Sequence, residues 1–73
     1  MINIEYDSRG ELNIFVDKEG AEKLKKYLTY LIEEKDTHFH LMTPSWGGSD
    51  LDEEKIVEDL ELINQVRLQL VED

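Results

Sequence analysis

Hydrophobic and polar residues alternate in two short stretches near the start of the chain. Residues 2–7 and 12–17 follow this alternation with few exceptions, and a four-residue link containing Gly10 separates them. Two period-2 runs joined by so short a glycine-containing link are typical of a β-hairpin. We therefore predict a hairpin whose core face carries the apolar positions of both strands: Ile2, Ile4, Tyr6, Leu12, Ile14 and Val16. Phe15 is expected on the opposite, polar face, beside Asn3 and Glu5.

The hydrophobic period changes after the second stretch. Apolar residues now recur three and four positions apart, which is the spacing of an amphipathic helix (Ala21, Leu24, Leu28 and Leu31). Asp17 stands immediately before this pattern and is a suitable N-cap. We predict a helix that begins after Asp17 and ends near Lys35, where a cation suits the helix dipole.

Alternation returns at residues 37–42, which predicts a third strand with Phe39 and Leu41 facing the helix. Turn-forming residues fill positions 43–49, and an acidic run follows at 50–61, for which the sequence allows either a mobile loop or a short helix around 52–58. Residues 62–71 alternate again and predict a fourth strand. The predicted fold is α+β, in the order β-β-α-β-β. One helix packs on one face of a four-stranded, largely antiparallel sheet.

The length and the charge of the chain restrict its function. Its 73 residues give a single domain over 1–73, and 18 acidic against 8 basic side chains give a formal charge of -10. Such a charge disfavours nucleic acid and anionic membranes as partners and favours basic proteins. No run of residues has the length and hydrophobicity of a membrane span or the layout of a signal peptide, so we expect a cytoplasmic protein.

The sequence offers little for catalysis or for a cofactor. Cysteine is absent, which excludes disulfides and thiolate ligands. His38 and His40 share one strand face and resemble two metal ligands, with an acid from residues 50–61 as a third, but surface or interface histidines are the simpler interpretation. The glycines beside Trp46 lack the lysine of a phosphate-binding loop. We therefore predict no catalytic, cofactor or metal site.

Trp46 is the most informative single residue. A lone tryptophan in a Pro/Gly turn either caps the edge of the core or is an exposed anchor for a partner, since tryptophan is enriched in binding hot spots. Aromatic residues on the open sheet face, together with the acidic run, have the composition of a protein-binding surface. The predicted partner-binding residues are Trp46, His38, His40, Phe15, Asp50, Asp52, Glu53, Glu54, Glu58 and Asp59.

Two segments also resemble a known family. Residues 38–48 read His-Phe-His-Leu-Met-Thr-Pro-Ser-Trp-Gly-Gly, and residues 61–64 read Glu-Leu-Ile-Asn. Together they resemble the small acidic immunity proteins encoded beside bacterial polymorphic toxins, immunity protein family thirty-two. The likeness extends over roughly residues 10–72, and residues 49–52 fit the pattern only in part. The resemblance implies neutralisation of a cognate toxin by protein–protein interaction.

These observations lead to one functional hypothesis and two alternatives. The hypothesis is a bacterial antitoxin-type immunity protein whose acidic, aromatic-containing surface binds a cognate protein toxin with a basic active-site cleft. The first alternative is a housekeeping interaction module that forms a homodimer through the second sheet face. The second is a small metal-binding protein that uses His38 and His40.

Overall fold

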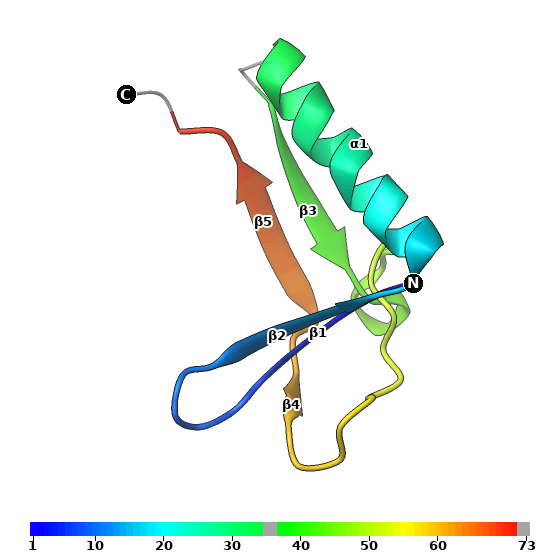
Figure 1. Ribbon diagram of the computed structural model, residues 1–73, viewed down its shortest axis with the longest axis vertical. Helices are drawn as coiled ribbons and strands as arrows, with labels where there is room; N and C mark the ends of the chain where they lie inside the picture. The colour runs from blue at the N-terminus through cyan, green and yellow to red at the C-terminus, as the bar shows by residue number, and fades with distance from the viewer. Residues whose placement is uncertain (35–36, 72–73) are drawn as a thin grey trace.

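The computed structural model describes residues 1–34 and 37–71. It contains one helix and two antiparallel sheets (Figure 1). The elements in chain order are β1 (Ile2–Tyr6), β2 (Leu12–Val16), α1 (Lys18–Glu34), β3 (His38–Met42), the 3-10 turn η1 (Pro44–Trp46), β4 (Glu61–Leu62) and β5 (Gln65–Gln69). The predicted α+β class with a single helix is confirmed.

The predicted single four-stranded sheet is wrong in its detail. Strands β2, β1 and β4 form one sheet in that order, and β3 and β5 form a second. The expected last strand over residues 62–71 is divided at residues 63–64, because its first part pairs with β1 and its second part with β3. At the break, the Ile63 N–H donates to the Ile4 carbonyl and Asn64 turns to contact Thr43.

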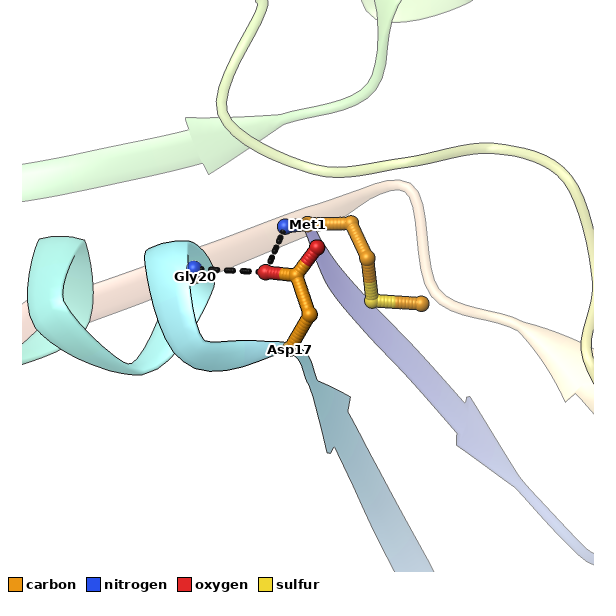
Figure 2. Close-up of polar contacts among 3 residues, drawn as sticks. All are labelled: Met1, Asp17 and Gly20. Carbon is orange, nitrogen blue, oxygen red and sulfur yellow. Dashed lines mark hydrogen bonds and ion pairs between the residues drawn. The ribbon is translucent and has the colours of Figure 1, made fainter.

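Helix α1 begins as the sequence predicts. The Asp17 carboxylate accepts the Gly20 N–H at 2.8 Å and also contacts the amino group of Met1, so that it joins the start of β1 to the start of the helix (Figure 2). The Met1 ammonium and then the Gly20 N–H hold the pKa of Asp17 below its usual range. The structure describes the helix as far as Glu34, and the predicted terminal residue Lys35 lies outside the described residues.

The core lies where the helix and the two sheets meet. Ile2, Ile4, Leu41 and Leu51 are buried together there. The helix packs on the inner face of the β3–β5 sheet, where the ring centroids of Tyr27 and Phe39 are 4.8 Å apart. This confirms the predicted inward direction of Phe39 and Leu41.

The hairpin, by contrast, is only partly covered. Figure 1 shows that α1 runs along β3 and that the far end of the hairpin projects away from the helix. Side chains expected in the core therefore remain between 41% and 54% exposed: Tyr6, Leu12, Ile14 and Val16. The predicted core face of the hairpin is thus buried at Ile2 and Ile4 and open along β2.

Candidate functional site

The turn that carries Trp46 is fixed by its backbone. Trp46 and Gly48 both donate their N–H to the Thr43 carbonyl at 3.0 Å, and Gly47 donates to the Pro44 carbonyl at 3.0 Å. Pro44 occupies the first turn of η1, where its missing N–H costs nothing and its φ angle is already suitable. The turn therefore presents Trp46 in one backbone conformation.

Each glycine of the Trp-Gly-Gly sequence has a structural reason. Gly47 has φ +90°, a left-handed conformation that disfavours any residue with a Cβ atom. A Cβ atom on Gly48 would lie 2.5 Å from the Met42 carbonyl oxygen, closer than such atoms can approach. The first glycine thus closes the turn, and the second allows the chain to pass close to the end of β3.

Two polar residues, buried Thr43 and half-buried Asn64, join residues 38–48 to residues 61–64. The Thr43 side chain is fully buried, and its hydroxyl bonds to Asn64 Oδ1 at 2.8 Å. The Thr43 N–H also donates to the Asn64 carbonyl at 3.0 Å. Residues 38–48 and 61–64 are therefore parts of one structural unit, at the point where the chain passes from β4 to β5.

Trp46 itself has no such structural reason. Its side chain is 56% exposed, so it does not cap the core edge. Its neighbours Thr43, Gly47 and Gly48 are explained by folding alone, whereas an indole placed on a rigid turn and open to solvent is not. Exposed tryptophans of this kind are enriched among the residues that dominate protein–protein binding.

The acidic segment beside this turn is irregular, and β1 holds it in place. Asn3 and Glu5 are both fully buried, although the sequence pattern places them on an open polar face. The Asn3 side-chain amide donates to the carbonyls of Asp52 at 3.2 Å and Glu54 at 3.0 Å. The sequence did not identify these two residues as buried. The alternation of apolar and polar residues along a strand is the same whether the polar face is open to water or hydrogen-bonded to a loop.

The Glu5 carboxylate completes this attachment. It accepts the N–H groups of Ile56 at 2.7 Å and Val57 at 3.1 Å. The Asp52 N–H donates to the Ile2 carbonyl at 2.7 Å. Residues 52–57 thus form a loop that is bound along one face of the first sheet, and not the short helix around 52–58 that the sequence also allowed.

The structure separates the predicted acidic residues into two groups. Asp50 is engaged internally, since it accepts the Tyr27 hydroxyl at 2.6 Å and lies 3.7 Å from Lys23 Nζ. Burial, and then the contact with Asp50, raises the pKa of Tyr27 to about 12. Asp52 is half-buried. Glu53 is also half-buried and accepts the Ser45 hydroxyl, which ties the acidic segment to the Trp46 turn.

The second group is open to solvent. Glu54, Glu58 and Asp59 are all exposed. Lys55 lies among them and donates to the backbone carbonyl of Glu58 at 2.8 Å. Of the predicted acidic residues, these three are the ones that the structure leaves exposed to solvent.

His38 and His40 occupy the outer face of β3 and are exposed, with ring centroids 4.9 Å apart. Gln65 Nε2 lies 3.1 Å from Nδ1 of His40. Across residues 1–34 and 37–71, no group of three or more metal-ligating side chains is placed to hold a metal ion. The expected single aromatic face is also absent from this described part, because Phe15 belongs to the hairpin sheet and the histidines to the other.

Comparison with known proteins finds no matching family model, no matching curated protein and no matching solved structure. Within the described residues, no helix is both long and apolar enough to cross a membrane.

Proposed function

We propose that this chain is an immunity protein of the antitoxin type, which binds a cognate bacterial toxin in the cytoplasm and blocks it without catalysing a reaction. The observation that carries the proposal is the exposure of Trp46 on a turn whose other residues are fixed for structural reasons. Tryptophan at the centre of an interface commonly supplies a large share of the binding free energy. The resemblance of residues 38–48 and 61–64 to immunity proteins supports the same function.

Charge supports a basic partner. The chain carries a formal charge of -10, and Glu54, Glu58 and Asp59 lie exposed on a segment that is tied to the Trp46 turn through Glu53 and Ser45. A toxin that acts on nucleic acid has a basic cleft for phosphates. Carboxylates held on this segment attract such a cleft and speed association, while the Trp46 indole becomes buried in the complex and slows dissociation.

The first experiment tests Trp46. The probe is the toxin domain that the proposal expects a neighbouring gene to encode, used for binding and for rescue of growth by co-expression. Trp46→Ala should weaken binding by about 30-fold or more, the scale of a hot-spot residue, and should abolish rescue. Because Trp46 is exposed, its replacement should leave the urea midpoint nearly unchanged.

Ile32→Ala is the matched control, since Ile32 is also a large exposed residue but lies on α1. It should bind the toxin domain as the unmodified chain does. Equal binding by Trp46→Ala and the unmodified chain would remove Trp46 from the interface and the main support for the proposal.

The second experiment tests the charge. Replacing Glu54, Glu58 and Asp59 by their amides should slow association with the toxin domain, and the rate should fall steeply with salt in the unmodified chain. The matched control replaces three exposed acids of α1, Glu22, Glu33 and Glu34, and removes the same net charge from a different surface. If both triple variants lose association rate equally, only net charge matters and the acidic segment is not the contact surface.

A further inference from the structure

Strand β2 is an open edge of the hairpin sheet. In the part of the chain that the structure describes, β2 pairs with β1 on one side and with no strand on the other. It contains no proline and no charged side chain between Leu12 and Val16. Proline and charged side chains are the usual features that prevent an edge strand from pairing with another chain. Because β2 has neither, its edge is unprotected.

The register shows which backbone groups of β2 are free. The Asp7 N–H donates to the Glu11 carbonyl and the Asp17 N–H donates to the Met1 carbonyl. In an antiparallel ladder the bonded pairs alternate, so Phe15 and Asn13 exchange bonds with β1. The N–H and C=O groups of Leu12, Ile14 and Val16 consequently point to the outer edge.

The side chains of the same three residues are apolar and open. Leu12, Ile14 and Val16 are 54%, 52% and 41% exposed. They lie opposite Tyr6, Ile4 and Ile2 of β1 and so continue the face of the sheet that forms the core. One edge thus offers both unpaired backbone groups and a row of hydrophobic side chains.

The whole chain buries less surface than its size predicts. Its accessible surface is 5457 Å², whereas a compact monomer of 8.6 kDa exposes about 4,700 Å². Its radius of gyration is 12.9 Å, against about 11 Å for a compact domain of this length. The excess surface, roughly 750 Å², is close to the area of about 800 Å² that one partner buries in a standard interface.

We propose that β2 pairs antiparallel with β2 of a second copy of this chain, so that the two hairpin sheets become one continuous sheet around a two-fold axis at Ile14. This register sets Ile14 against Ile14 of the second copy and Leu12 against Val16 of the second copy. The three free N–H and three free C=O groups of each strand then form six hydrogen bonds, and the apolar rows meet on one face.

A second copy fits this edge because the strand is self-complementary. Because all three outward-facing positions of β2 (Leu12, Ile14 and Val16) are apolar, the antiparallel register sets apolar side chains against apolar side chains, and a two-fold axis closes the assembly. Glu11 falls opposite Asp17 of the second copy, but the Met1 amino group already balances the Asp17 charge. Two chains of charge -10 repel each other, so salt should strengthen this association.

The experiment measures mass and amide protection on the full chain. Light scattering should give twice the 8.6 kDa of one chain at about 100 μM, a concentration at which a dimer with a Kd of about 1 μM is mostly formed. Hydrogen exchange of the Leu12, Ile14 and Val16 amides should slow by 10-fold or more between dilute and concentrated protein. The Asn13 and Phe15 amides, bonded to β1, are the internal control and should be protected at both concentrations.

Two variants locate the interface. Ile14→Pro removes one outward N–H and Ile14→Lys places a charge at the two-fold axis, so both should be monomeric. Ile56→Lys, which makes the same replacement at an exposed position in the acidic segment, should remain dimeric. If a variant fails to fold, hydrogen exchange of the β2 amides in the unmodified chain still tests the proposal.

A mass of one chain at every concentration overturns the proposal, and so does a dimer in which the three β2 amides exchange freely. Protection of these amides only in the presence of the toxin domain also overturns it, in favour of strand addition by the toxin. The result is independent of the proposed function, because toxin association should weaken with salt whereas the β2 pairing should strengthen.

Discussion

Replacement of Glu5 by glutamine is the most direct test of how the acidic segment is held. The Glu5 side chain is fully buried and its two oxygens accept the N–H groups of Ile56 and Val57. Glutamine has the same shape but only one acceptor oxygen, and its NH₂ group then faces a backbone donor. One N–H is left without a partner, and residues 52–57 lose part of their attachment to β1.

The magnitude follows from that orphaned donor. A buried N–H without an acceptor costs about 1–3 kcal/mol, and we expect Glu5→Gln to lower the free energy of unfolding by about 2 kcal/mol. The total stability of a 73-residue domain is roughly 4–11 kcal/mol, so this change is a large fraction of it. The Ile56 and Val57 amides should also exchange faster.

Urea unfolding followed by circular dichroism measures the effect. With an m-value of about 1 kcal/mol/M, the midpoint should fall by about 2 M at unchanged m. Glu22→Gln is the matched control, because Glu22 is exposed on α1, and its unfolding free energy should change by less than about 0.5 kcal/mol. If the two variants are equally stable and the Ile56 amide keeps its protection, the carboxylate does not hold the segment and the reasoning fails.

Three further predictions concern the turn and the helix. Gly48→Ala should lower stability by about 1–3 kcal/mol, measured by thermal unfolding, because its Cβ meets the Met42 carbonyl; an unchanged Tm would contradict the close approach. Thr43→Val should lower the free energy of unfolding in urea by about 1 kcal/mol, because the hydrogen bond to half-buried Asn64 Oδ1 is lost; an unaltered free energy would show that this bond does not stabilise the fold. Because burial and then a carboxylate raise the pKa of Tyr27 to about 12, above the value of about 10 in an unfolded chain, stability should be complete below pH about 10 and fall as pH rises towards 12. Tyr27→Phe should reduce the loss of stability between pH about 10 and 12. If the variant loses stability with pH as the unmodified chain does, Tyr27 is not its cause.

The local elements of this chain are predictable because each depends on neighbours in sequence. Alternation predicts β1, β2 and β3, and the change of period after Asp17 predicts α1 together with its N-cap. Alternation also predicts the direction of side chains on a strand that is covered on one face alone, as β3 shows for Phe39 and Leu41. These features depend on the period of a strand or a helix and on a capping bond within one turn.

The candidate site was predictable in part. The sequence identified Trp46 and the acidic run, but it allowed Trp46 to be buried or exposed, and only the structure gives it an open position. It also could not separate Asp50, which accepts the Tyr27 hydroxyl, from Glu54, which faces solvent. Acids next to one another in sequence differ because their partners come from remote elements.

The sequence by itself therefore determined β1, β2, α1 and β3, the charge, and the position of a tryptophan in a turn. Only the tertiary structure decided the division into two sheets, because residues 61–69 pair first with β1 and then with β3. It also decided that Asn3 and Glu5 are buried while Leu12 and Ile14 are open. The physical reason is that alternation shows that a strand has two faces, whereas the covering of each face depends on segments about fifty residues away (Asn3 to Glu54, Glu5 to Ile56).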